Sequence, residues 1–426
     1  MEVTKNQPVI VSAARTPVGS FGGALQEVKV VNLGSEVLRE LLARLDAKPT
    51  VRERVKRTRP DTLQSQQKSE VEDRYMDWSS GSRELPIDEV IFGHVLQGGQ
   101  GQNTARQASI RAGIPQEINA FTVNKVCASG MKAVALAAQA IRAGEAQAIL
   151  AGGMENMSRA PYLLPDLRWG QRMFDTQARD LMVFDGLYEI FYDYHMGITA
   201  ENIADKYGIS RRAQDELGAQ SNHRALKAQE SGAFDAEIVP IEISDEEVFS
   251  EDEPPMETSV EKMSKLPTVF KEDGTVTAGN ASGIADGAAG LFITSEEYAR
   301  THDLKIRARI NGSTSGGVDP KYMGLGPIPA VRQLTDQLSC SVQDFDLVEL
   351  NEAFASQTIA CAKELELDHE KTNIYGSGIS LGHPIGCTGA RILVTLLHGM
   401  EQRENKLGLA TLCIGGGQGM AMALER

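Results

Sequence analysis

The chain has few cysteines, few aromatic residues and no long apolar run. Its cysteines are odd in number and widely spaced: Cys127, Cys340, Cys361, Cys387 and Cys413. This usage argues against a disulfide framework and indicates a reducing compartment, so we expect a cytoplasmic protein. The N-terminus passes from MEVTKNQP directly into a strand-like segment, with no visible signal peptide. No stretch approaches the length of a transmembrane helix, so we expect no membrane span.

Basic residues are fewer than acidic ones, 43 against 58, and the formal net charge is −15. This balance opposes nonspecific binding to nucleic acid, although local basic residues can still hold an anionic ligand such as a phosphorylated cofactor. The chain has 426 residues, of which 41% are hydrophobic, so it can bury a large core. We expect two or three domains and no nucleic-acid partner.

The segment 119–153 shows the clearest local pattern. An apolar, β-branched run, Ala120 to Val126, predicts a strand, and an Ala-rich periodic segment from Ala128 to Gly144 predicts a helix. A second strand is predicted at Ala148 to Ala151 before two glycines. The pattern predicts a βαβ unit with Cys127 at the carboxyl end of a buried strand.

Cys127 occupies a position that suits a nucleophile. The start of the following helix favours a thiolate, which is the reactive form of cysteine. Small residues follow at Ala128, Ser129 and Gly130 and leave room for a substrate. The alternative is that Cys127 is a small buried hydrophobe, the commoner fate of an intracellular cysteine. This segment alone leaves both interpretations open.

The first half continues with weaker signals. Asn32 is predicted to cap a helix from Leu33 to Leu45, and Thr294 to Glu297 has the pattern of a capping box. Residues 46–85 carry basic side chains and a polar run with almost no apolar periodicity, which predicts a solvated, partly disordered insertion. Its basic part is either solvated surface or a partner-binding segment. Further predicted elements are strands at Val9–Ala13 and Asp88–Leu96, a helix at Thr104–Ala112, and helices near Ile198–Tyr207 and Ser210–Gly232 in a separate inserted region that also holds the acidic tract Asp245–Glu253.

The last part of the chain repeats the order of the first. DLVELNEA resembles DEVIFGHV, and the order of elements in 373–417 resembles that in 120–153. These similarities predict two related halves whose Gly-rich turns face one pocket. The predicted elements are strands at Lys305–Asn311, Asp346–Leu350 and near Ile374, helices at Ile328–Leu338 and Ala353–Leu365, and then the GHPIG turn with its helix and the LCIGGG strand with its closing strand.

The predicted duplication brings His383 and Cys413 towards Cys127. A thiol nucleophile needs a nearby base, and a second thiol can move protons in a dry pocket. Backbone N–H groups near Gly415 can form an oxyanion hole for a tetrahedral thioester intermediate. A zinc site is the rival interpretation, but HPIGC is the only close His/Cys pair and lacks a CxxC partner, so we expect no metal. The other cysteines are expected to pack helices.

Eight segments resemble the thiolases, the acetyl-CoA acetyltransferase and 3-ketoacyl-CoA thiolase family. They occur in family order and span nearly the whole chain: VNKVCASGMKA, GGMENMSRAPY, DYHMGITAEN, TVTAGNASGIADGAA, MGLGPIPA, NEAFA, GHPIGCTGARI and LCIGGGQGMA. The resemblance implies an α/β protein with the αβαβα five-layer fold, two duplicated halves and an inserted loop domain. It also implies a homotetramer, built as a dimer of dimers.

The resemblance implies boundaries and roles as well. Residues 1–157 would form the N-terminal half, containing the insertion 46–85 and completed by about 283–304. Residues 158–282 would form the loop domain and 305–426 the C-terminal half. In the catalytic set, Cys127 would be the nucleophile, His383 its base, and Cys413 the thiol that deprotonates the incoming nucleophile. Asn351 would hold the water of one oxyanion hole, and the N–H groups of Cys127 and Gly415 would be the donors of the other. Matches to the pantetheine and acyl channel are His195, Met196, Ser282, Met323, Ala353 and Phe354.

The resemblance therefore implies an acetyl-CoA C-acetyltransferase that uses acyl-CoA and CoA and has no permanently bound cofactor. The alternatives are a broad-range 3-ketoacyl-CoA thiolase, a ketosynthase-type condensing enzyme, a non-catalytic acyl-CoA or lipid carrier, and a Cys/His hydrolase. Two features depart from the family pattern. The insertion 46–85 is unusually long, and KLPTVF at Lys265 to Phe270 replaces the frequent KLRPAF, so a basic contact near the CoA entrance is missing or replaced.

Overall fold

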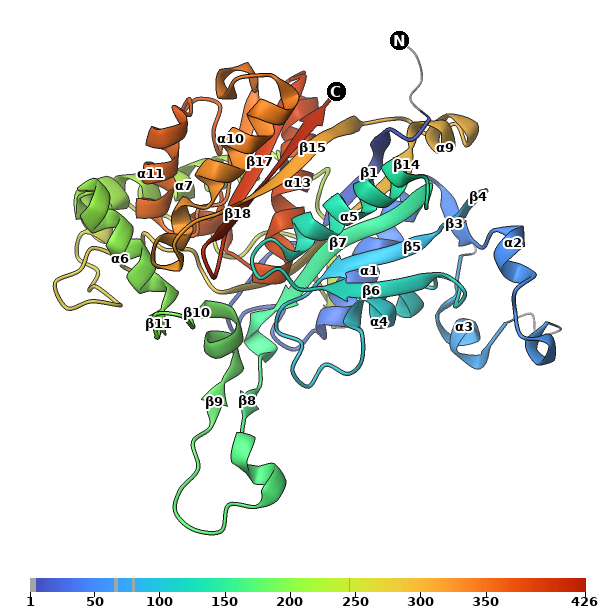
Figure 1. The fold of residues 1–426 in the computed structure, drawn as a ribbon, viewed down its shortest axis with the longest axis horizontal. Coiled ribbons are helices and arrows are strands. Elements are labelled where there is room, and N and C mark those ends of the chain that lie inside the picture. Colours follow the sequence, from blue (N-terminus) through green and yellow to red (C-terminus); the bar gives the residue numbers. More distant parts are fainter. Residues whose placement is uncertain (1–4, 65–67, 79–80, 245) are drawn as a thin grey trace.

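The computed structural model describes residues 5–64, 68–78, 81–244 and 246–426 and is built around one large mixed sheet (Figure 1). Its strand order is β16-β17-β18-β15-β1-β14-β7-β5-β6, and the short β2 pairs with β14. The strands are β1 (Pro8–Arg15), β2 (Gly19–Ser20), β5 (Glu89–Gly93), β6 (Asn119–Val123), β7 (Ala148–Asn156), β14 (Ala285–Ser295), β15 (Ala308–Gly317), β16 (Leu347–Leu350), β17 (Leu407–Ile414) and β18 (Gln418–Glu425).

The sheet consists of two similar parts that meet between β1 and β15. Outward from this junction the orders are β1-β14-β7-β5-β6 and β15-β18-β17-β16. In the N-terminal part, β14 pairs antiparallel with both β1 and β7, and β5 pairs parallel with both β7 and β6. In the C-terminal part, β18 pairs antiparallel with both β15 and β17, and β16 pairs parallel with β17. The junction itself is short, with Val9 opposite Arg309 and Ile10 opposite Ala308. The predicted duplication is confirmed at the level of architecture.

Helices and sheet form five layers. The middle layer is α5 (Ser129–Ala143) and α13 (Ile385–Gln402), whose apolar side chains share one core with both parts of the sheet. On the outer face of the N-terminal part lie α1 (Val30–Ala43) and α4 (Thr104–Arg111), and on that of the C-terminal part lie α10 (Pro327–Leu338) and α11 (Ala355–Leu365). The predicted αβαβα fold is therefore correct.

The two central helices approach each other at backbone contact. A β-carbon on Gly130 of α5 would lie 2.8 Å from the backbone nitrogen of Ala390 in α13. In the other direction, a β-carbon on Gly389 would lie 2.6 Å from the nitrogen of Met131. Side chains larger than hydrogen cannot fit there, so these glycines fix how closely the two helix starts come together.

The region 157–282 packs beside this core and carries an extended arm (Figure 1). The predicted helix pair is present as α6 (Met196–Tyr207) and α7 (Arg211–Glu230). The arm begins and ends at the paired strands β8 and β9. The other elements of the region are η2 (Met157–Arg159), β8 (Tyr162–Leu163), η3 (Pro165–Trp169), β9 (Arg179–Asp180), η4 (Met182–Leu187), β10 (Tyr188–Glu189), β11 (Tyr194–His195), β12 (Ile241–Ser244), β13 (Glu247–Phe249) and α8 (Val260–Met263).

The insertion 46–85 has more structure than its composition predicts. It contains β3 (Ala47–Thr50) paired with β4 (Arg83–Pro86), and between them α2 (Glu53–Lys56), η1 (Asp61–Leu63) and α3 (Glu70–Tyr75). Trp78 Nε1 donates to the Gly113 carbonyl at 2.8 Å, and the buried Glu72 accepts from Gln116 N at 3.1 Å. The partial disorder predicted for this solvated insertion is therefore not seen in its described part, which forms these short elements; its residues 65–67 and 79–80 lie outside the described residues.

Several local predictions need correction. The first helix begins at Val30 with Lys29 at its N-cap, because Val30 and Val31 are themselves buried on its core-facing side, and Asn32 is therefore not the cap. Ser295, rather than Thr294, caps α9 (Glu296–Thr301) by accepting from Tyr298 N at 3.0 Å.

Two predicted strands also differ. Strand β6 is not buried: it lies at the edge of the sheet, and Phe121 is 37% exposed. No strand forms near Ile374, although all residues there are described, because Asn373 and Gly376 have positive φ values of 50° and 77° and turn the chain. Only isolated bridges remain, and the Asn373 side chain bonds the backbone of Leu350. Remaining elements are η5 (Pro320–Leu325), η6 (Val342–Asp344) and α12 (Gly378–Leu381).

Candidate active site

All predicted site residues except Asn351 line one cavity of about 480 Å³. It lies where the loops before α5 and α13 meet the loop after β17 and the 157–282 region. Its lining is mostly apolar and includes the Cys127 and Cys413 thiols and the His383 imidazole, which the predicted acyl transfer requires. These predicted residues are Cys127, His195, Met196, Ser282, Met323, Ala353, Phe354, His383, Cys413 and Gly415.

Cys127 is held by a strained turn between β6 and α5. Val126 has φ +47°, an unfavourable conformation for a β-branched residue. The turn is fixed by neighbouring side chains: Ser129 Oγ accepts from Lys125 N at 2.8 Å and donates to Val126 O at 2.7 Å, and Asn124 Oδ1 accepts from Val126 N at 3.0 Å. This turn places Cys127 at the cavity with only 9% of its surface exposed.

The Cys127 side chain is a protonated thiol at neutral pH. Burial raises its pKa to about 11, and this outweighs hydrogen bonds from the backbone N–H groups of Gly415 and Cys127, which act in the opposite direction. The preference of the helix start for a thiolate is present in these backbone hydrogen bonds, which lower the pKa, but burial outweighs it because the cavity withholds the water that would solvate the anion. The thiol needs a base.

His383 provides a neutral imidazole with one free acceptor nitrogen. Its Nδ1 lies 2.7 Å from Thr388 Oγ1, and this hydroxyl donates its own proton to the Pro384 carbonyl at 2.9 Å. The hydroxyl can then only accept from His383, so Nδ1 carries the proton and Nε2 carries the lone pair. Nε2 is buried and bonds no described protein group. Burial, with the charge of Arg391 added, lowers the pKa of His383 to about 3.

Cys413 and Gly415 lie at and just beyond the end of β17. Cys413 is fully buried, and burial together with the nearby Cys127 raises the pKa of its thiol. A β-carbon on Gly415 would lie 2.9 Å from Met196 Cε, so glycine leaves its N–H free to approach the Cys127 sulfur. Gly416 and Gly417, both at φ +78°, then make the turn into β18. The second thiol thus comes from the end of β17, and the N–H donor comes from the turn that directly follows it.

Asn351 follows β16 and is fully buried behind the cavity. Neither polar atom of its side chain bonds another described protein group. Its amide oxygen is closely packed, since a β-carbon on Gly378 would lie 2.7 Å from it. Because Asn351 is not among the lining residues, its predicted role in an oxyanion hole stays a prediction.

The wall of the cavity contains an aromatic residue that sequence reasoning did not assign to the site, Phe270, beside the predicted His195 and Phe354. His195 stacks on Phe270 with ring centres 4.6 Å apart, and Phe270 meets Phe354 edge-on at 6.4 Å. Gly197 makes this possible, because a β-carbon there would overlap the Phe270 ring. Phe270 ends the KLPTVF segment, so the available signal was an isolated aromatic residue in a mostly polar stretch.

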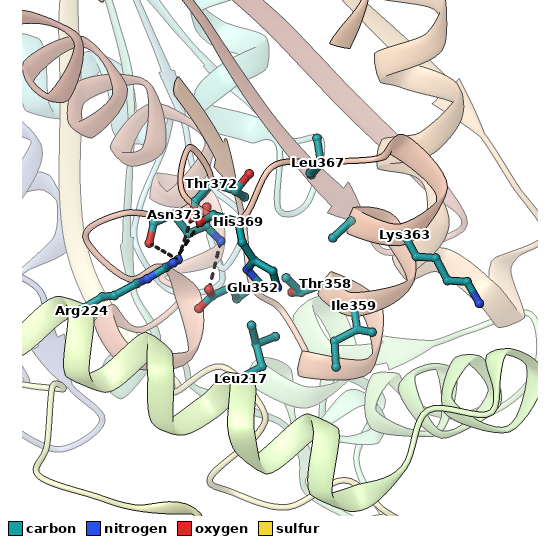
Figure 2. A pocket seen from close by; sticks show the side chains of 11 residues that line it. Leu217, Arg224, Glu352, Thr358, Ile359, Lys363, Leu367, His369, Thr372 and Asn373 are labelled. Carbon is teal, nitrogen blue, oxygen red and sulfur yellow. Dashed lines mark hydrogen bonds between the residues drawn. The ribbon is translucent and has the colours of Figure 1, made fainter. Parts of the chain in front are cut away.

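A second cavity, of about 300 Å³, lies between α7, α11 and the turn at 367–373 (Figure 2). Arg224 donates to the carbonyl groups of Thr372, Asn373 and His369 at 2.8, 3.2 and 2.9 Å. The buried Glu352 accepts from Asn373 Nδ2 at 3.0 Å. This cavity contains none of the predicted site residues, and its polar groups hold the turn that replaces the predicted strand near Ile374.

Within the described part of the chain, no three or more His, Cys, Asp or Glu side chains are grouped so that they could hold a metal ion. Among the same residues, no helix is long and apolar enough to cross a membrane.

Comparisons with known proteins agree with this geometry. Residues 8–68 and 80–297 match the model of the thiolase N-terminal domain, and residues 304–426 match that of the thiolase C-terminal domain. The gap at 69–79 coincides with α3 of the insertion. The chain is 49% identical over 424 residues to an acetyl-CoA acetyltransferase of Syntrophomonas wolfei and 50% identical over 423 residues to one of Escherichia coli, with 98% of each chain covered.

A solved structure shows the same likeness. The crystal structure of the Bacillus anthracis acetyl-CoA acetyltransferase superposes with a TM-score of 0.87 at 42% identity and covers 98% of both chains. Together with the full-length family matches, this similarity identifies the chain: it belongs to the thiolase family.

Proposed function

We propose that the protein is an acetyl-CoA C-acetyltransferase. It would condense two acetyl-CoA molecules to acetoacetyl-CoA and CoA, and in reverse cleave a 3-ketoacyl-CoA with CoA. The observation that carries the proposal is the meeting of Cys127, His383 and Cys413 in one largely apolar cavity. Relatives about half identical over nearly the whole chain carry the name acetyl-CoA acetyltransferase.

In the first half-reaction, His383 Nε2 takes the proton of the Cys127 thiol while the sulfur attacks the carbonyl carbon of the acyl donor. The carbonyl oxygen becomes an oxyanion, for which we assign the N–H groups of Cys127 and Gly415 as donors, with Asn351 and His383 serving a second oxyanion site. When the donor is acetyl-CoA, the carbon–sulfur bond to CoA then breaks, and the imidazolium returns its proton to the departing thiolate. When the donor is a 3-ketoacyl-CoA, the bond between its C2 and C3 carbons breaks, the departing acetyl-CoA carbanion takes the proton of the Cys413 thiol, and the imidazolium reprotonates Cys413. An acyl-Cys127 thioester remains.

In the second half-reaction, the Cys413 thiol passes its proton to His383, and the resulting thiolate deprotonates the incoming nucleophile. For synthesis this nucleophile is the methyl carbon of a second acetyl-CoA, and for cleavage it is the thiol of CoA. The nucleophile attacks the acyl-Cys127 carbonyl, the bond to the Cys127 sulfur breaks, and the departing Cys127 thiolate takes the proton held by the His383 imidazolium. His195, Met196, Ser282, Met323, Ala353 and Phe354 are assigned to the channel for pantetheine and the acyl group, and no permanently bound cofactor is needed.

We also propose the domain limits 1–157 with 283–304, 158–282 and 305–426, and a homotetramer built from dimers. The support for assembly is apolar surface: Trp169 and Phe174, in the segment between β8 and β9, are 87% and 90% exposed, and β6 leaves an open sheet edge. The five cysteines are free, in agreement with a reducing compartment such as the cytoplasm.

A short acyl chain fits this cavity best. The stacked rings of His195 and Phe270, braced by Phe354, form a wall beside the adaptable Met196. Each additional buried methylene gains at most about 1 kcal/mol, so discrimination must come from a steric stop. We expect kcat/KM to fall steeply from four-carbon to six- and eight-carbon 3-ketoacyl-CoA substrates. A flat or rising profile would favour the alternative, a broad-range 3-ketoacyl-CoA thiolase.

The activity is tested by incubating the purified protein with acetoacetyl-CoA and CoA. Loss of the enolate absorbance together with acetyl-CoA formation is expected of this enzyme. A ketosynthase-type enzyme, which normally lacks a counterpart of Cys413, would not form acetyl-CoA from these two substrates. A carrier would bind them without turnover, and a hydrolase would release free acid without requiring CoA. Any of these three outcomes would contradict the proposal.

A further inference from the structure

Glu155 is a fully buried carboxylate near the end of β7. Its Oε2 accepts from the backbone nitrogens of Gly386 at 2.9 Å and Val95 at 3.1 Å. Its Oε1 accepts from Leu96 N at 3.2 Å and lies 3.1 Å from His94 Nε2. A buried carboxylate is stable only with such partners, so both oxygens are committed to neighbouring segments.

These partners belong to different halves of the molecule. His94 to Leu96 follow β5 in the N-terminal half, whereas Gly386 lies in the first turn of α13 in the C-terminal half, three residues after His383. The Gly386 N–H is one of the first amides of a helix, which have no acceptor within the helix, and a carboxylate there also interacts favourably with the helix dipole. Glu155 thus ties the start of α13 to the opposite half.

The contact is tightly packed. A β-carbon on Gly386 would lie 2.6 Å from Glu155 Oε2 and 2.9 Å from the Met154 carbonyl oxygen. A β-carbon on Gly153 would overlap the Gly386 carbonyl oxygen. With so little free space, a change in the Glu155 hydrogen bonds must displace the first turn of α13.

That turn also sets the direction of the His383 ring. The ring is held through Nδ1 by Thr388, whose hydroxyl is in turn bonded to Pro384, so all the groups that orient it lie at the start of α13. Moving this turn moves Nε2. A misplacement of about 1 Å can cost on the order of 100-fold in rate.

We propose that Glu155 is a positioning residue for the transfer reaction: through Gly386 it fixes the distance and direction between His383 Nε2 and the Cys127 sulfur. The assignment rests on the proposed function for the roles of these two groups. Nothing in the sequence motifs distinguishes Glu155 from its neighbours; the four donors that converge on it do.

Because Glu155 is charged, its role in positioning His383 can be distinguished by experiment from its effect on the ionisation of the Cys127 thiol. After burial, this negative charge is a further cause that raises the pKa of the Cys127 thiol. It therefore opposes thiolate formation, and its removal should ease ionisation while it loosens the geometry. Turnover and thiol reactivity are then expected to change in opposite directions, which a general loss of structure would not produce.

The test is Glu155→Gln. Whichever way the new amide is oriented, its NH₂ group faces backbone N–H groups that need an acceptor, so part of the network is lost at nearly unchanged volume. We expect kcat for acetoacetyl-CoA cleavage to fall on the order of 100-fold with little change in KM. Alkylation of Cys127 by iodoacetamide at fixed pH, mapped by mass spectrometry, should be as fast as in the wild type or faster.

Asp88→Asn is the matched control. Asp88 accepts from Gln147 N at 2.7 Å and Ala148 N at 3.0 Å and pairs with Arg52 at 2.6 Å, so it ties down the opposite end of the same strand β7. Its loss should lower the unfolding temperature without changing kcat or the alkylation rate.

Equal kcat in folded Glu155→Gln and wild type would overturn the positioning role, as would an equal fall of kcat in Asp88→Asn. If Glu155→Gln does not fold, Glu155→Asp replaces it: the charge stays, so alkylation should be unchanged while kcat falls, and unchanged kcat overturns the proposal. A wild type that does not cleave acetoacetyl-CoA instead overturns the proposed function, a result visible before any variant is compared.

Discussion

The two halves deliver their reactive groups to the cavity by different local structures. In the N-terminal half, β6 leads into a strained turn at Val126 that presents Cys127 before α5. In the C-terminal half, the corresponding strand is missing, and a turn with Gly382 at φ +81° presents His383 before α13. One architecture, used twice, thus supplies the thiol from one half and the base from the other.

Burial acts on these two groups in opposite directions. It raises the pKa of Cys127 to about 11 and lowers that of His383 to about 3, so both are neutral at rest. One side chain holds a proton and the other offers a lone pair. The nucleophile and its base come from different halves, and each of these two side chains can be removed separately.

Cys127→Ala should have the largest effect. It removes the nucleophile and only one small side-chain atom, so acyl-enzyme formation should be abolished while the unfolding temperature stays close to that of the wild type. Turnover of acetoacetyl-CoA and CoA is the measurement. Cys340→Ala, at a partly exposed cysteine outside the cavity, is the control and should retain full activity. Normal turnover in Cys127→Ala would disprove the mechanism.

His383→Asn should follow. Without the imidazole the thiol keeps its proton, and loss of a general base typically costs 10²- to 10⁴-fold. We expect a loss of about that size in the rate of Cys127 acylation, measured by single-turnover kinetics with acetyl-CoA. An acylation rate within a few-fold of the wild type would show that another group takes the proton.

Cys413→Ala should affect the second half-reaction alone. Cys127 and His383 remain, so acetyl-CoA should still acylate one equivalent of enzyme, whereas transfer of the acetyl group to CoA should fall about 10²-fold or more. Rapid-quench measurement of the acyl-enzyme should show it forming and then persisting. Loss of the acylation step itself would contradict the separate roles of the two thiols.

The smallest expected effect is on the pH dependence of the free energy of unfolding. His383 has a folded pKa below its ordinary value of 6.5, so the unfolded chain binds more protons at intermediate pH. Its neutral form therefore stabilises the fold fully above about pH 6.5, and this contribution is lost as the pH falls towards 3. The difference in unfolding free energy between wild type and His383→Asn should shrink over this window; a constant difference would contradict the buried neutral imidazole.

The fold and the cavity residues could be predicted from the sequence because the residues concerned lie within recognisable motifs. Cys127, His383 and Cys413 stand in segments that resemble one family, and the repeated strand and helix order predicts that their turns converge. The raised pKa of Cys127 could not be predicted in the same way, because it depends on burial by segments distant in sequence.

Other features depended on tertiary structure as well. The strand expected near Ile374 is lost to a left-handed Asn373, whose side chain bonds Leu350 across the fold. The roles of Phe270 and Glu155 can be inferred only from their contacts with His195 and Gly386, which are distant in sequence. Periodicity describes the face that a residue presents, and it does not identify the distant group that meets it.

The most direct test of the account is to locate the acyl group. The wild-type protein is incubated with acetyl-CoA, unfolded in acid to preserve thioesters, digested, and analysed by mass spectrometry. We predict an acetyl group on the peptide containing Cys127, and its disappearance when CoA is added before the acid. Acetylation of Cys413 instead, or turnover without any acetylated cysteine, would contradict the division of roles between the two halves.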